Sequence, residues 1–178
     1  MLHGTISICR TIFPEDCPGA QKVMTPQENG CGFSDKDLET AFGFLTHEER
    51  RGVCPYLENK VFSAKAVLMK ENEASNYLGF LAEGRLAVKK ETGFKGKYII
   101  LAILQKGTVV GETELLGHGP RSSTVVAVED GRLLTLTDES FDLLLQEDPP
   151  LGIKLLKRIV YIMSLRLRKA GERLSQLL

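Results

Sequence analysis

The chain has 178 residues, of which 43% are hydrophobic and 26% are charged, and its formal net charge is zero. This length predicts one domain with one appendage, and the balanced charge argues against a protein that mainly binds nucleic acid. No run approaches the roughly 18 apolar residues of a membrane span, and the start lacks a signal peptide, so we expect a cytoplasmic protein that does not contact membranes.

Residues 1–33 are rich in proline, glycine and polar residues, which predicts a loop or a loosely packed arm. The four cysteines (Cys9, Cys17, Cys31 and Cys54) include no C-x-x-C pair and match no zinc or iron–sulfur spacing. We therefore expect reduced, partly buried thiols and no bound metal. The alternative is a redox or metal sensor built from the three N-terminal cysteines, Cys9, Cys17 and Cys31.

Two short helices are predicted over residues 34–59. Ser34 is a suitable N-cap, and the residues after it are apolar at helical spacing. In the stretch THEER, Thr46 and Glu49 have the spacing of a capping box, in which each side chain binds the backbone of the other.

A series of short strands follows. Apolar and β-branched residues alternate there, and turn signals recur about every ten residues, which is typical of a sandwich or barrel. The expected strands cover residues 61–69, 77–90, 97–107, 123–131 and 132–137.

Helical spacing returns at the C-terminus. Thr137 caps a short helix that Pro149 and Pro150 are expected to stop. The rest, residues 151–178, forms one long helix with the a/d spacing of a coiled coil. Residues 34–150 are expected to form a β-rich unit with its helices. The seam contains Leu156, Val160, Met163, Leu167, Ala170, Leu174 and Leu177.

A second apolar stripe of Leu155, Ile159 and Ile162 lies on a neighbouring face of the same helix. Two apolar faces need two partners, so we expect the second stripe to cover the domain core and the seam to form a homodimer. The alternative is one broad stripe on one core. Basic residues are also frequent on this helix, but no second helical unit follows, so direct DNA binding is not expected.

The segment VVGETELLGHGPRSSTVV (109–126) combines groups that suit an anionic ligand. Gly111 lets the backbone approach a ligand closely, and a short helix from Glu112 would point free N–H groups at a negative charge, with Leu115 and Leu116 as anchors. Arg121 carries a planar cationic fork suited to phosphate. Ser122, Ser123 and Thr124 add hydroxyls, and Glu112 can accept from a sugar hydroxyl, so the set describes a nucleotide.

Each residue has a simpler explanation when it is taken alone. Arg121 could be a surface arginine paired with Glu114, Glu112 could be a solvated turn residue, and His118 could be an exposed loop residue. The ordered set G-E-x-x-L-L-x-x-x-P-R-S-S-T-V is far more specific than any of its members.

This ordered set resembles the phosphate-binding cassette of the cyclic nucleotide-binding domain family, the type found in catabolite activator protein and the kinase A regulatory subunit. The resemblance extends over about residues 42–178. It implies a mainly β fold with flanking helices, a jelly-roll-like β-roll and a long C-terminal dimerisation helix, here without a helix-turn-helix output domain.

The resemblance also implies the site. Arg121 would pair with the cyclic phosphate, Glu112 would accept from the ribose 2′-hydroxyl, and Ser122 and Ser123 would add contacts to the phosphate or to a syn guanine. Gly111 and Thr113 would supply backbone contacts. The base would lie toward the C-terminal helix, near Arg166 and Leu167.

Two departures from the family pattern concern affinity. Val110 replaces the usual aromatic residue before the Gly-Glu pair, and Thr113 and Glu114 replace an apolar and a small residue, which adds negative charge near the phosphate. No paired general acid and base, Ser-His-Asp order or metal set is present.

The function that best fits is a cAMP or cGMP receptor, not an enzyme, which couples ligand binding to a helix rearrangement read by an unknown effector protein. The alternative is a regulatory module of the same fold with a vestigial nucleotide site, which senses redox state or acts as a scaffold. Convergence of Arg121 and Glu112 on one pocket would favour the receptor.

Overall fold

The computed structural model describes residues 32–74, 76–94, 96–113 and 119–176. In chain order these residues form α1 (Asp35–Phe42), α2 (His47–Val53), a 3₁₀ turn η1 (Cys54–Tyr56), then β1 (Glu58–Phe62), β2 (Val67–Met69), β3 (Tyr77–Glu83), β4 (Arg85–Glu91), β5 (Tyr98–Gln105), β6 (Val109–Val110), β7 (Thr124–Ala127), β8 (Gly131–Thr137), α3 (Asp138–Glu147) and α4 (Pro149–Ser175). Most of the expected 1–33 arm lies outside this part of the chain.

The eight strands of the described residues are antiparallel and form two four-stranded sheets, in the orders β1-β8-β3-β6 and β2-β7-β4-β5. The first sheet is the middle layer of the molecule. Its β3 residues alternate between two apolar cores: Leu78 and Phe80 pack with the helices, and Leu81 packs with the second sheet. This is the predicted β-roll with flanking helices and a long C-terminal helix.

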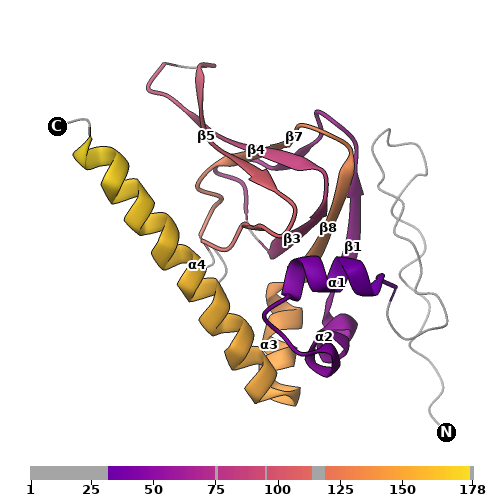
Figure 1. The fold of residues 1–178 in the computed structure, drawn as a ribbon. Coiled ribbons are helices and arrows are strands. Elements are labelled where there is room, and N and C mark those ends of the chain that lie inside the picture. The colour runs from indigo at the N-terminus through magenta and orange to yellow at the C-terminus, as the bar shows by residue number, and fades with distance from the viewer. Residues whose placement is uncertain (1–31, 75, 95, 114–118, 177–178) are drawn as a thin grey trace, which may run out of the picture.

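The helices lie at one end of the sheets, and α4 runs away from them beside the roll, while the β4–β5 hairpin projects at the opposite end (Figure 1). The second apolar stripe of α4 packs into the helical core, where Leu155 and Ile159 are fully buried. Within the seam, Val160, Leu167 and Leu174 are 48%, 76% and 62% exposed, whereas Leu156 and Met163 pack against the same helical core as the second stripe. The predicted separation into two faces therefore holds only for the exposed residues Val160, Leu167 and Leu174.

The predicted helix caps are confirmed. The Ser34 side chain accepts from the N–H of Asp37, Thr46 and Glu49 form the reciprocal capping box, and Thr137 caps α3. These signals depend only on residues three positions apart, so they can be recognised before the tertiary fold is known.

Three predicted boundaries differ most from the structure. The strand expected over 61–69 is two strands, because the chain turns between β1 and β2 and Lys65 adopts a left-handed φ of 70°. The strand expected over 77–90 is a hairpin, since Gly84 turns the chain with φ 88°. Pro149 and Pro150 begin α4 instead of stopping α3, because proline is tolerated in the first helical turn.

Cys54 is buried at the end of α2 and is disulfide-bonded, which differs from the reduced thiol expected there. The other three cysteines, and any role of theirs in redox sensing, lie outside the described residues. None of the helices in the described ranges has both the length and the apolarity needed to cross a membrane.

Candidate functional site

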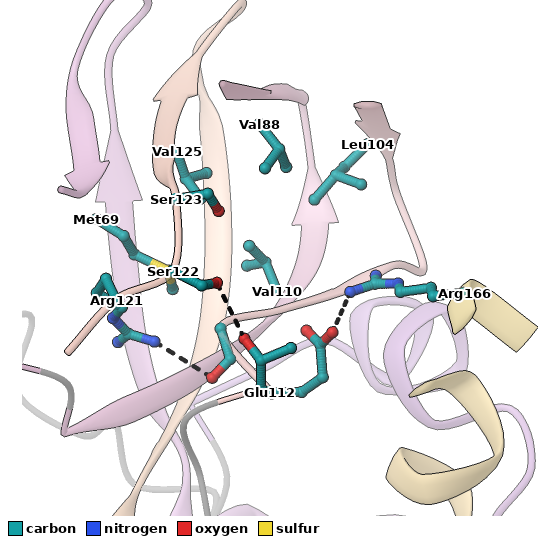
Figure 2. A pocket seen from close by; sticks show the side chains of 12 residues that line it. Met69, Val88, Leu104, Val110, Glu112, Arg121, Ser122, Ser123, Val125 and Arg166 are labelled. Atoms are coloured by element: carbon teal, nitrogen blue, oxygen red, sulfur yellow. Dashed lines mark hydrogen bonds and ion pairs between the residues drawn. The ribbon is translucent and has the colours of Figure 1, made fainter. Parts of the chain in front are cut away.

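The candidate site is a cavity of about 180 Å³ between the second sheet, the segment after β6 and α4. Figure 2 shows side chains from all three parts pointing toward one another. All of the predicted site residues line this cavity, namely Gly111, Glu112, Thr113, Arg121, Ser122, Ser123 and Arg166. The expected short helix after Glu112 and its anchors Leu115 and Leu116, together with Glu114 and His118, lie outside the described residues.

Arg121 is buried, with 4% of its surface exposed, so it is not a surface arginine. Its guanidinium donates to the carbonyl oxygens of Tyr77 (2.6 Å) and Gly111 (3.2 Å), and it lies 4.9 Å from the centre of the Tyr77 ring. The sheet thus holds this cation in one place before any ligand arrives, which lowers the entropy lost on binding an anion.

Gly111 sits directly against this guanidinium. Its φ is 77°, a conformation that favours glycine, and a Cβ at this position would collide with the Arg121 guanidinium and approach the Met69 methyl to 2.8 Å. The glycine of the motif is therefore required by both backbone conformation and space.

Ser122 and Ser123 follow Arg121 along one rim of the cavity. The Ser122 hydroxyl lies 3.4 Å from the Thr113 hydroxyl, so the residues that follow β6 and those that precede β7 meet here. The backbone of this rim is also fixed: the N–H of Arg121 donates to the Glu73 carbonyl (2.8 Å), and the N–H of Asn72 donates to the Arg121 carbonyl (2.9 Å).

Glu112 is 3% exposed, which excludes the simple explanation of a solvated turn residue. An isolated buried carboxylate is costly, and Glu112 accepts a hydrogen bond from the guanidinium of Arg166 on α4. Arg166 also donates to the carbonyl oxygen of Val109 at 2.5 Å. One arginine therefore ties the long helix to the segment that holds Gly111 and Glu112.

The sequence placed Arg166 and Leu167 together near the base. The structure puts Arg166 in the cavity, but Leu167 is 76% exposed. The difference arises because successive residues of a helix point about 100° apart, so only one of the pair can face the roll.

Five apolar side chains of the cavity were missed: Met69, Val88, Leu104, Val110 and Val125. They come from five different strands and form the wall opposite the polar groups. Strand alternation could have indicated that they face inward, but their meeting at one cavity depends on how the sheets fold over each other. The described residues contain no group of three or more His, Cys, Asp or Glu side chains arranged for a metal.

The fold and the site together define a β-roll domain with a cavity that has polar groups on one side, an apolar wall on the other and a helix beside it. The model of the cyclic nucleotide-binding domain matches residues 59–148, which is half of the chain. The chain therefore belongs to the cyclic nucleotide-binding domain family, a family of regulatory rather than catalytic domains, and the sequence-based assignment is confirmed.

Two relatives and one solved structure illustrate the similarity. The cyclic AMP receptor protein of Thermus thermophilus is 29% identical over 136 residues, which cover 76% of this chain and 61% of that protein. The cAMP-dependent protein kinase regulatory subunit of Hypocrea atroviridis is 32% identical over 101 residues, 57% of this chain and 21% of that protein. A cyclic nucleotide-binding domain from Methylobacillus flagellatus superposes with a TM-score of 0.72 at 26% identity, covering 78% and 83% of the two chains.

Proposed function

We propose that this chain binds a cyclic nucleotide, cAMP or cGMP, in the cavity and reports its presence through α4. The observation that carries the proposal is that Arg121 and Glu112, both buried, line the same cavity. A permanent cation and a hydrogen-bond acceptor at two points of one pocket suit a ligand with an anionic end and a hydroxyl. The two relatives described above are named for cyclic AMP, which supports the same ligand class.

The phosphate would occupy the Arg121 end. The guanidinium provides charge, the rim residues Ser122 and Ser123 provide N–H and hydroxyl donors, and Gly111 leaves room for close approach. Thr113 lies on the same rim within reach of Ser122. Because these donors are held by the backbone contacts described above, the site is pre-organised for an anion.

The ribose would lie at the Glu112 end, with its 2′-hydroxyl donating to the carboxylate. In the described structure that carboxylate already accepts from Arg166, and a carboxylate has room for several donors. The base would then lie between Arg166 and the apolar wall formed by residues such as Val88 and Leu104. An apolar wall of this kind can contact the face of either adenine or guanine, so the proposal includes both cAMP and cGMP.

Helix α4 is the element that would report binding, because it contacts both the ligand cavity and helix α2. Arg166 joins it to Glu112, and Lys154 joins it to the capping box of α2 through two 2.8 Å contacts with Glu49. A ligand that changes the first contact biases the position of the whole helix, provided it binds the two positions with different affinity.

The exposed part of the α4 seam supports the further proposal of a homodimer formed through Leu156, Val160, Met163, Leu167 and Leu174, of which Leu156 and Met163 also pack against the helical core. Large apolar side chains spaced along one helical face, as Val160, Leu167 and Leu174 are, are unusual on a monomer surface. With this interface, residues 34–150 would be the sensing unit and 151–178 the coupling helix. The effector protein and the cytoplasmic location remain parts of the proposal, as does the absence of a catalytic step.

Isothermal titration calorimetry with cAMP and with cGMP tests the proposal. The protein is first unfolded and refolded to remove any nucleotide that copurifies, and its fold is checked by circular dichroism. We expect binding at micromolar concentration or tighter. Arg121→Ala should weaken it by about 100-fold or more, because a buried charged partner of the phosphate is lost.

Arg85→Ala is the matched control. Arg85 lies at the start of β4 in the second sheet, is about half exposed and is paired with Glu129 at 2.5 Å, so its loss should leave nucleotide affinity unchanged. No heat with either nucleotide from a folded, ligand-free protein would overturn the proposal and favour the vestigial-site alternative.

A further inference from the structure

Lys90 lies just outside the cavity and contacts the rim residue Ser122. Its Nζ donates to the Ser122 carbonyl oxygen at 2.8 Å and to a carboxylate oxygen of Glu71 at 2.9 Å. Lys90 is not one of the residues that line the cavity, so its role is distinct from direct ligand contact.

The contact fixes a particular peptide plane. A carbonyl oxygen and the N–H of the following residue belong to one planar trans peptide and point in opposite directions. Lys90 therefore sets the direction of the Ser123 N–H through the Ser122 carbonyl. Asn72 does the same for the Ser122 N–H, because its own N–H donates to the Arg121 carbonyl at 2.9 Å.

Glu71 holds the lysine where it is needed. One of its carboxylate oxygens accepts from Lys90, the other accepts from the N–H of Glu91 (3.1 Å), and its backbone N–H donates to the Thr124 hydroxyl (3.1 Å). The hydrogen bond from Lys90, followed by that from Glu91, holds the pKa of Glu71 below its usual value, so the carboxylate is charged at neutral pH. Only 16% of the Glu71 side chain is exposed, compared with 48% for Lys90.

We propose that Lys90, held by Glu71, is a positioning residue that aims the Ser123 N–H at the anionic group of the ligand. This inference rests on the proposed function for the identity of the ligand. The contacts of Lys90 with Ser122 and Glu71 are present in the structure without any ligand. Lys90 acts through the backbone, so its contribution depends on donating to a carbonyl and not on charge alone.

The neighbouring Lys89 offers a matched control. Side chains of successive strand residues point to opposite faces, and the Lys89 Nζ lies 4.5 Å from the centre of the Tyr98 ring. Lys89→Met and Lys90→Met therefore remove the same charge from adjacent positions of β4. Lys89→Met shows the effect of removing one positive charge from β4 without touching the contact with the Ser122 carbonyl.

The test measures cAMP and cGMP affinity by calorimetry and records the ¹⁵N–¹H resonance of Ser123 in the nucleotide-free protein. We expect Lys90→Met to weaken binding by about fivefold, the scale of a half-exposed charged contact, and to shift the Ser123 resonance. Lys90→Arg, which keeps donors at this place, should retain most of the affinity. Lys89→Met should change neither quantity.

The proposal is overturned if Lys90→Met binds as tightly as Lys89→Met and leaves the Ser123 resonance in place. If the unmodified protein binds neither nucleotide, the proposed function fails, and the resonance alone decides the positioning role. A shift in Lys90→Met that Lys89→Met does not reproduce would then support that role, and its absence would exclude it.

Discussion

The guanidinium of Arg166 donates to the carboxylate of Glu112, although the two residues are 54 positions apart in the chain. This contact joins the long helix to the buried acid that lines the cavity. Removing the arginine would leave a buried carboxylate without its cation and would release α4 from the site at the same time.

Arg166→Ala should therefore reduce both nucleotide affinity and the response of α4. We expect affinity to fall by about tenfold or more, the usual scale when one partner of a buried charge pair is lost. Hydrogen exchange of residues 160–175, measured with and without nucleotide, should respond to the ligand in the unmodified protein and far less in the variant.

Arg168→Ala is the control for this experiment, because Arg168 lies on the same helix two positions along and is exposed. An undiminished exchange response in Arg166→Ala would show that the helix senses the ligand by another route.

Gly111→Ala tests the close approach of the backbone to Arg121. The substitution places a Cβ where φ is 77° and where the guanidinium and Met69 already fill the space. We expect the free energy of unfolding to fall by about 1–3 kcal/mol and nucleotide affinity to drop with it, because Arg121 must move. Denaturant unfolding and calorimetry measure the two effects. Gly119→Ala, with no atom within 4 Å of the added Cβ, should change neither.

The sequence predicted those parts of the fold that depend on near neighbours along the chain. The caps at Ser34, Thr46 and Thr137 need only a side chain and a backbone N–H three residues later. The turn between β1 and β2 was missed because its residues, 63–66, include no glycine, proline, asparagine or aspartate to mark a turn. What separates the strands is their pairing with β8 and β7, which belong to different sheets.

The site residues likewise differ in how far the sequence alone could reveal them. One motif contains Gly111, Glu112 and Arg121, so its ordered letters were sufficient to find them. Lys90 has no motif, since its role depends on the register that sets β4 beside β7. The sequence located Arg166 only by its position along the C-terminal helix. Its contact with Glu112 also depends on how α4 is rotated about its own axis against the roll.

The contact between Glu49 and Lys154 predicts a dependence of stability on pH. The hydrogen bond from Lys154, followed by that from the Thr46 backbone, lowers the pKa of Glu49 in the folded protein. A lowered folded-state pKa stabilises the fold at pH values above the unfolded value, about 4.3 for glutamate, and this contribution is lost as the pH falls through the folded value.

Urea unfolding of Glu49→Gln should therefore show a destabilisation that is constant near neutral pH and shrinks as the pH falls below about 4. Glu48→Gln, at the neighbouring exposed position, should unfold like the unmodified protein throughout. A difference between Glu49→Gln and the unmodified protein that did not change with pH would mean that the Glu49 charge makes no contribution through Lys154.

The exposed seam of α4 leads to a prediction about assembly. Leu167 is the most exposed of its large apolar residues at 76%, whereas Ile159 on the other stripe is 1% exposed. Leu167→Asp should disrupt a dimer formed through the seam without unfolding the domain, because the side chain contributes little to the core. Light scattering coupled to gel filtration should show the unmodified protein as a dimer and the variant at half that mass, with circular dichroism unchanged.

Val128→Asp, which charges an apolar residue that is 42% exposed on a different surface, should remain dimeric. A monomeric unmodified protein, or a Leu167→Asp variant of full dimer mass, would exclude this interface.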